Sequence, residues 1–354
     1  MRSDCRANIE VNTGRIQGYH QESSYTGNDE SYAFDGYKEL GYFTSDRMQK
    51  TAVIDGKLMR IDRNGNPIAE PLKGVGLEVE IECDGVNEPK ALSAIMEKII
   101  FPNFKFGSKM FKMQHDGSLG GRTSVEVITQ PMTVERVRND YAAWKAMYEY
   151  MEAFDMSADS MHTSCGMHVN LSVGLFGKTE EEQKENLRKL YFLINNRYKF
   201  FRTLFWRNQY ATNWCLRMTE ENIANHMLNW CDDRSLASEL DYHNAKSLDF
   251  DRVTSSHHAC LNYSHFDAGR IEIRLVGGQR DFDCFRETME CIFWIVKRIP
   301  DLSWDDLDDL VKVFKGCNEY VMNRLAICVF NYGLTQTDFD KLSRACKIAR
   351  YDID

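Results

Sequence analysis

The stretch "GVGLEVEIECDG", residues 74–85, alternates glutamates with aliphatic residues. Glu78, Glu80 and Glu82 recur at every second position, which is typical of a β-strand that carries its acids on one face. An ordinary half-buried strand turns such a face to water, and that interpretation stays open for this stretch alone. If the face is covered instead, three like charges repel one another and need a cation between them.

Three further stretches combine an aliphatic face with a face of ionisable or metal-binding groups. They are "RTSVEVITQP" with Glu126, "CGMHVNLSVG" with His168, Asn170 and Ser172, and "GRIEIRLVGG" with Arg270, Glu272 and Arg274. If these strands are neighbours, their acids merge with those of residues 74–85 into one acidic surface. Carboxylates with one imidazole suit Mg²⁺ or Mn²⁺.

The arginines extend this chemistry. Arg270 and Arg274 would be badly placed beside a bare metal ion, but they fit a phosphate that bridges metal and guanidinium. Metal ions and arginine around phosphate indicate phosphoryl transfer. Taken singly, His168 can be a structural histidine, and Arg270, Glu272 and Arg274 can be a cross-strand salt-bridge ladder. Periodicity alone does not show that the polar faces converge.

The elements that must position these residues mix strands and helices. Strands are expected at 75–83, 111–115, 123–128, 166–173, 257–264 and 270–276. Helices are expected at 89–100, 133–154, 180–206, 219–231 and 283–299, followed by a helical tail over 301–350. Helix starts are expected at Thr179/Glu182, Ser303/Asp306 and Thr335/Asp338. Because strands do not alternate regularly with helices, the pattern favours an α+β fold with an antiparallel sheet.

Residues 1–72 differ from the rest of the chain. They are rich in Gly, Tyr, Ser and Asp and show no long amphipathic helix. A hairpin turn is expected at Asn64-Gly65. We expect residues 1–72 to form a β-rich extension of unknown role and residues 73–354 to form one catalytic domain.

Composition excludes several classes of function. The chain has 354 residues and a net charge of −9, which argues against a general nucleic-acid binder. No apolar run reaches the roughly 18 residues of a membrane span, and the first residues lack the apolar core of a signal peptide. The eleven cysteines are scattered without a Cys-x-x-Cys pair, which indicates reduced thiols. We therefore expect a cytoplasmic protein with no nucleic-acid or membrane partner.

Four motifs, in chain order, resemble the amidoligase family of the glutamine synthetase-like carboxylate–amine ligases. They are the Glu-x-Glu strand "GLEVEIE", the segment "HDGSLGGRTSVEVITQPM", the Cys-Gly-x-His-Val strand "SCGMHVNLS" and the strand "NYSHFDAGRIEIRL". Each motif is short, but all four occur in the family's order within residues 74–276. The resemblance implies a half-barrel of antiparallel strands backed by helices, with a helical C-terminal region.

The resemblance also implies roles for individual residues. One metal site would take Glu78, His168 and Glu272, and a second would take Glu80 and Glu126. The implied catalytic residues are Arg274 at the transferred phosphate, Arg270, and Asp116, which would join the second metal site or bind the amine. The implied nucleotide-binding residues are Ser172 and Asn170. Arg252 and Asn262 are further candidates, with a surface charge and ordinary polar packing as their alternatives. The chain departs from glutamine synthetase at position 170, where the His-x-His pair reads His168-Val169-Asn170.

The implied activity is that of an ATP- and Mg²⁺- or Mn²⁺-dependent carboxylate–amine ligase. ATP would phosphorylate a carboxylate to an acyl phosphate, and an amine would displace the phosphate to leave an amide or isopeptide bond. The substrates would be amino acids, peptides or protein side chains, and a homo-oligomer is compatible with the fold. Two alternatives stay open: a phosphotransferase of the same fold, and a non-catalytic scaffold or assembly protein that retains the fold.

Overall fold

The computed structural model describes twenty stretches of the chain. They are residues 20–23, 30–33, 42–44, 47–49, 51–54, 57–61, 67–71, 73–83, 94–104, 110–114, 124–129, 131–160, 165–207, 215, 246, 248, 259–263, 266, 269–331 and 335–351. Within these stretches, no helix is both long enough and apolar enough to cross a membrane. The predicted helix 219–231 and the Asn64-Gly65 turn lie outside the described residues.

A central antiparallel sheet organises the molecule. Its strands, in spatial order, are β1 (His20–Ser23), β2 (Glu30–Ala33), β9 (Phe111–Gln114), β10 (Ser124–Thr129), β8 (Val75–Cys83), β12 (Met167–Ser172), β14 (Arg270–Ile273) and β13 (Leu261–Asn262). A short strand, β11 (Met156–Ser157), also pairs with β8. Two smaller sheets join β3 (Tyr42–Thr44) to β4 (Arg47–Gln49), and β5 (Thr51–Ile54) to β6 (Lys57–Ile61) and β7 (Pro67–Pro71). The antiparallel pairing confirms the predicted α+β class.

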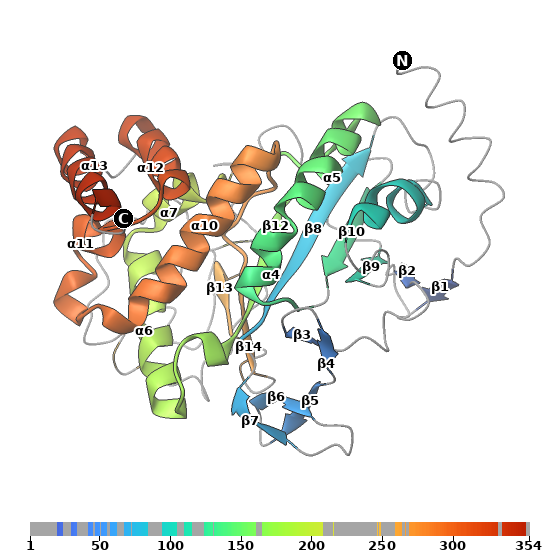
Figure 1. Ribbon diagram of the computed structural model, residues 1–354, viewed down its shortest axis with the longest axis horizontal. Helices are drawn as coiled ribbons and strands as arrows, with labels where there is room; N and C mark the ends of the chain where they lie inside the picture. Colours follow the sequence, from blue (N-terminus) through green and yellow to red (C-terminus); the bar gives the residue numbers. More distant parts are fainter. Residues whose placement is uncertain are drawn as a thin grey trace.

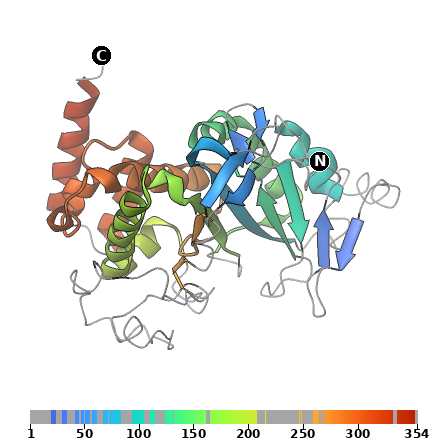
Figure 2. The same ribbon diagram turned by 90° about the horizontal axis from the view of Figure 1, so that it is seen from below.

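Helices follow and interleave with these strands. They are α4 (Val134–Asn139), α5 (Tyr141–Ala153), α6 (Glu180–Asn196), α7 (Tyr198–Leu204), α10 (Phe282–Arg298), α11 (Leu310–Phe314), α12 (Glu319–Asn331) and α13 (Gln336–Tyr351). Shorter helical turns are η1 (Met96–Ile100), η2 (Phe101–Asn103), η4 (Val173–Leu175), η7 (Ile299–Asp301) and η8 (Trp304–Asp306). In Figure 1, α4, α5 and α10 lie across one face of the central sheet. Figure 2 shows the C-terminal helices at the opposite end of the molecule from β1 and β2.

Local sequence explains where several helices begin. Thr179 and Glu182 form the predicted capping box, each side chain bonding the other residue's backbone N–H at the start of α6. The Asp281 carboxylate accepts a hydrogen bond from the Cys284 N–H at the start of α10. Such caps satisfy N–H groups that have no partner within the helix.

Helix boundaries differ from the prediction at several points. The single helix predicted over 133–154 is two helices, α4 and α5, separated at Asp140. The predicted helix 180–206 likewise divides into α6 and α7 at Arg197. The tail over 301–350 is a series of helices, not one, and Gly316 turns the chain between α11 and α12 with a φ of +82°. Hydrophobic spacing continues across such breaks, so periodicity cannot locate them.

The aliphatic face of β8 lies beneath the helices. Val75, Leu77 and Ile81 are fully buried, and each such side chain contributes about 1.5–3 kcal/mol through the loss of apolar surface to water. Trp144 of α5 is also fully buried, with its ring 4.8 Å from that of Phe285 in α10. Helix packing on this face buries the aliphatic side chains of the central strands and leaves their polar side chains on the other face.

Candidate metal centre and active site

Strand register brings the polar residues of four strands together. Glu126 of β10 lies opposite Glu80 of β8, and His168 of β12 lies opposite Glu78. Farther along, Glu272 of β14 lies opposite position 170 of β12. Because side chains alternate along each strand, these residues project from the same face of the sheet.

The polar face is buried, which decides against the solvated-face interpretation. Glu80 and Glu126 are each 5% exposed, His168 is 4% exposed and Glu272 is 6% exposed. Ionisable groups are rarely buried to this extent unless a partner or a metal ion compensates their charge. Glu82, at the end of β8, is only half-buried and belongs to neither acidic cluster.

Two triads of potential metal ligands share His168. Glu78, His168 and Glu272 form the first triad, and Glu80, Glu126 and His168 form the second; within each, the potential ligand atoms lie within 4.8 Å of one another. The two ring nitrogens face different triads. Nδ1 is 3.2 Å from the Glu78 Oε2 atom and 3.3 Å from the Glu272 Oε1 atom, whereas Nε2 is 3.8 Å from Glu80 Oε1.

The contact between Glu78 and His168 shifts the pKa values of both side chains. Burial by itself would raise the pKa of Glu78, but its hydrogen bond with His168 and the charge of that ring lower this pKa to about 2. Burial disfavours the charged form of His168, yet the bond to Glu78 and the other nearby carboxylates raise its pKa above the ordinary value. In the metal-free protein, a proton on His168 therefore offsets part of the negative charge.

The arginines predicted to act on phosphate both border the first triad. Arg274 Nη1 donates to Glu272 Oε1 at 2.7 Å and lies 3.5 Å from His168 Nδ1. Arg270 Nη1 donates to Asn170 Oδ1 at 2.7 Å, and Asn170 Nδ2 donates to Glu78 Oε1 at 2.8 Å. Asn170 therefore bridges a guanidinium and a carboxylate, a role that a neutral amide can fill at every pH.

The other predicted nucleotide-binding residues have structural contacts of their own. The Asn262 side chain donates to Glu272 Oε2 at 2.7 Å. The Ser172 hydroxyl accepts the Gly74 N–H at 3.0 Å. A cavity of about 140 Å³ is lined by Ser172, Asn170 and Arg270 together with Glu78. Asp116 and Arg252 lie outside the described residues.

Sequence analysis missed a third guanidinium near the second triad. Arg207 follows α7, is 7% exposed, and donates through Nη1 to the Val276 carbonyl at 3.1 Å. A Cβ atom on Gly166 would lie 2.5 Å from Arg207 Nη1 and 3.2 Å from Glu80 Oε2. The glycine of the Cys-Gly-x-His motif thus lets Arg207 approach Glu80, whose Oε2 also accepts the Gly166 N–H. The aromatic residues that precede Arg207 indicate core packing and give no signal for a charged group at this site.

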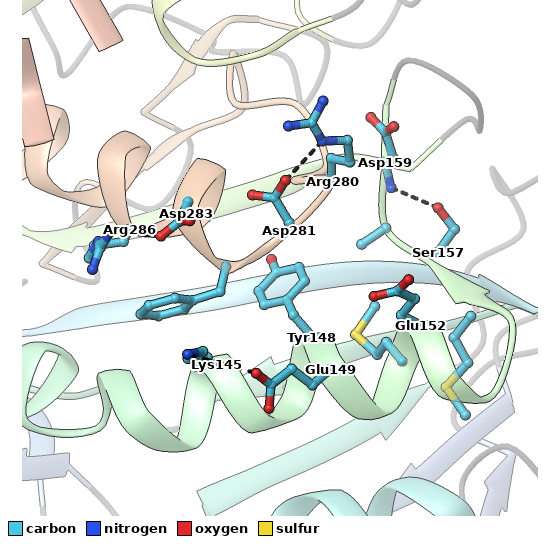
Figure 3. Close-up of a pocket in the computed structure, with 14 residues that line it drawn as sticks. Lys145, Tyr148, Glu149, Glu152, Ser157, Asp159, Arg280, Asp281, Asp283 and Arg286 are labelled. Carbon is cyan, nitrogen blue, oxygen red and sulfur yellow. Dashed lines mark hydrogen bonds and ion pairs between the residues drawn. The ribbon is translucent and has the colours of Figure 1, made fainter. Parts of the chain in front are cut away.

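A larger cavity, of about 610 Å³, lies between α5, β11 and the start of α10 (Figure 3). It shares no lining residue with the two triads. Six of its eight charged lining residues form ion pairs with one another: Arg280 with Asp281, Arg286 with Asp283, and Lys145 with Glu149. Because most of these charges are paired, the cavity lacks the concentration of buried like charge that marks the polar sheet face.

Comparison with solved structures gives distant likenesses. A solved structure described as "apo GmaS without ligand" overlaps this chain with a TM-score of 0.35 and 13% identity, over 98% of this chain and 89% of that chain. No protein-family model matches the sequence. No curated protein matches it. Because a TM-score of this size does not establish a common fold, the α+β assignment rests on the antiparallel sheet and its helices.

Proposed function

We propose that the protein is an ATP-dependent carboxylate–amine ligase that uses divalent cations at the two acidic triads. The observation that carries the proposal is the gathering of four carboxylates around His168, three of them buried and Glu78 half-buried, beside Arg270 and Arg274. The order of the four sequence motifs supports the same family of reactions. A fold-retaining scaffold has no use for buried, mutually repelling carboxylates.

The donor set fits a hard divalent cation. Carboxylate oxygens with one imidazole are ligands of Mg²⁺ and Mn²⁺. Two ligands of one Mg²⁺ lie about 3 Å apart when adjacent and about 4 Å apart when opposite, since each Mg–O distance is about 2.1 Å. The potential ligand atoms of each triad lie within 4.8 Å of one another, so small side-chain movements bring them into range. ATP would supply the phosphoryl group, and the bound cations would neutralise its charge during transfer.

The chain's own residues would orient and stabilise the reacting groups. Arg274 lies against both His168 and Glu272, so its guanidinium is placed to offset charge on a phosphoryl group held at the first triad. Arg270, held by Asn170, would contact a second phosphate oxygen. Asn262 would keep the Glu272 carboxylate oriented through their 2.7 Å bond.

The remaining assignments follow from the sequence resemblance. Asp116 would receive a proton from the amine or complete the second metal site, and Arg252 and Ser172 would contact the nucleotide. The substrates would be a carboxylate and an amine from small molecules, peptides or proteins, and neither nucleic acid nor membrane would be a partner. The enzyme would act in the cytoplasm, and a homo-oligomer is compatible with it.

Thermal unfolding tests the metal and nucleotide part of this proposal. Mg²⁺ with a non-hydrolysable ATP analogue is expected to raise the Tm of the wild-type protein and to leave the Glu80→Gln/Glu272→Gln double variant unchanged. Glu82→Gln is the matched control, because Glu82 lies on the same strand face outside both triads. No rise in the wild-type protein at saturating ligand would exclude a nucleotide site on this face.

Trapping separates a ligase from a phosphotransferase. Incubation with ATP, Mg²⁺, hydroxylamine and a mixture of amino acids should give a hydroxamate, because hydroxylamine attacks an acyl phosphate. ADP release that needs a phosphoryl acceptor, with no hydroxamate for any carboxylate, would favour the phosphotransferase.

A further inference from the structure

Two cysteines at the C-terminal end of the molecule lie in direct contact. The Sγ atoms of Cys317 and Cys346 are 3.6 Å apart, although the residues are separated by 29 positions in the chain. Other described thiols have different neighbours: those of Cys83 and Cys165 contact backbone carbonyl oxygens. We propose that Cys317 and Cys346 form a reversible disulfide when the protein meets a hydroperoxide.

The backbone holds Cys317 firmly in place. Gly316, with a φ of +82°, makes the turn that precedes it. The Cys317 N–H donates to the Phe314 carbonyl at 3.1 Å. The next residue, Asn318, donates to Glu290 of α10 at 2.9 Å and accepts the Val321 N–H at 3.0 Å. One partner of the thiol pair is therefore anchored to the helices that cover the sheet.

Cys346 belongs to α13, which packs against α11 and α12. Both thiols line two cavities, one of about 460 Å³ and one of about 350 Å³. A disulfide bond is about 2.05 Å long, so the two sulfur atoms must approach by roughly 1.5 Å. Empty volume around the pair gives their side chains space to rotate and gives a small oxidant access.

The reaction balances with a hydroperoxide as oxidant. One thiolate attacks a peroxide oxygen, the O–O bond breaks, and an alcohol or water leaves as a sulfenic acid forms. The second thiol then attacks the sulfenic sulfur and releases water, which leaves the disulfide. Two thiols and one hydroperoxide thus give one disulfide, one alcohol and one water, and a dithiol reductant reverses the change.

Contact with Cys346 and burial both raise the pKa of Cys317. Because the thiolate is the reactive form, oxidation should be slow at neutral pH and faster as the pH rises. The bond would tie α13 to the turn before α12. It would not involve the two acidic triads, so it is independent of the proposed ligase activity.

The experiment treats the full-length protein with equimolar hydrogen peroxide at pH 8.5, then alkylates all remaining thiols in denaturant. Intact mass should show two fewer alkylated cysteines than the eleven of the sequence, and peptide mapping should link residues 317 and 346. The Tm should rise on the order of 5 °C, since the bond closes a loop of about 30 residues, and a dithiol should reverse the rise.

Variants identify the pair. Cys346→Ser should no longer form the disulfide. Cys328→Ser, which removes a different buried thiol that lies in α12, should still form it. Full alkylation of the oxidised wild-type protein would overturn the proposal. So would a gain of oxygen atoms in place of the link, or a link that maps to other cysteines. Mapping of the wild-type protein decides the matter even if Cys346→Ser fails to fold.

Discussion

Glu126→Gln should stabilise the metal-free protein and remove the part of its stabilisation by metal that comes from the second triad. The Glu126 and Glu80 side chains lie opposite each other on β10 and β8, each 5% exposed. The substitution keeps the size of the side chain and removes one negative charge. Two effects of opposite sign should follow, one in the absence of cation and the other in its presence.

The magnitude follows from the geometry of the second triad. Its potential ligand atoms lie within 4.8 Å of one another, so two full charges there repel by about 3.5 kcal/mol at an effective dielectric constant of about 20. The protonated His168 offsets part of this repulsion. We expect a net gain of about 1–2 kcal/mol, which corresponds to a rise in Tm of roughly 1–3 °C. In the wild-type protein, Mn²⁺ at 100 times its Kd should add about 2.7 kcal/mol.

The assay is thermal unfolding at pH 8, with chelator and then with increasing Mn²⁺, for wild type, Glu126→Gln and the control Glu82→Gln. The control should behave as wild type with Mn²⁺ because Glu82 lies in neither triad. If Glu126→Gln lowers the Tm in chelator, positively charged side chains already compensate the Glu126 carboxylate. The argument that the second triad needs a metal ion to compensate its charge is then refuted.

Four further predictions concern pH, the polar bridge and the core. Mn²⁺ affinity, measured by calorimetry, should rise with pH through the raised pKa of His168 and be accompanied by proton release, because only the neutral ring binds metal; pH-independent binding would exclude His168 as a ligand. In chelator, the contribution of Glu78 to stability should be complete above pH 4.5 and be lost toward pH 2, since its folded-state pKa is lowered to about 2; replacement by Gln should remove this part of the acid dependence of Tm. Asn170→Leu removes hydrogen bonds of 2.7 and 2.8 Å to charged groups and should weaken Mn²⁺ binding about tenfold, at roughly 1.4 kcal/mol, whereas unchanged affinity would leave the bridge without a role. Trp144→Ala removes a fully buried ring and should cost about 3–5 kcal/mol in urea unfolding, and a loss below 1 kcal/mol would contradict the packing described for α5.

Strand positions could be predicted because the alternating pattern is a local property. The strand predicted over 75–83 is β8, Val75–Cys83, and the strand predicted over 123–128 is β10, Ser124–Thr129. The pairing of strands could not be derived from periodicity. The sequence of a strand shows which residues share a face, but the register of the strand depends on neighbours far along the chain.

Burial of the polar face was equally beyond a single-sequence argument. Glu80 reads as an ordinary exposed acid until β10 and β12 flank its strand. The bridge at Asn170 depends on the positions of Arg270 and Glu78, which lie 100 and 92 residues away. Arg207 could have been noticed only by asking what needs the space that Gly166 leaves open.

One consequence of the imidazole at position 168 concerns the order in which metal ions enter. Its Nδ1 atom faces Glu78 and Glu272, while its Nε2 atom faces Glu80. Neutral imidazole has a single lone pair to give, so the first ion to take it leaves the other triad with oxygen ligands only. The two sites should therefore differ in preference, with Mn²⁺ favoured where nitrogen is available and Mg²⁺ or Ca²⁺ tolerated where it is not. Titration should give two unequal steps, and a mixture of Mn²⁺ and Mg²⁺ should fill the protein with one ion of each kind.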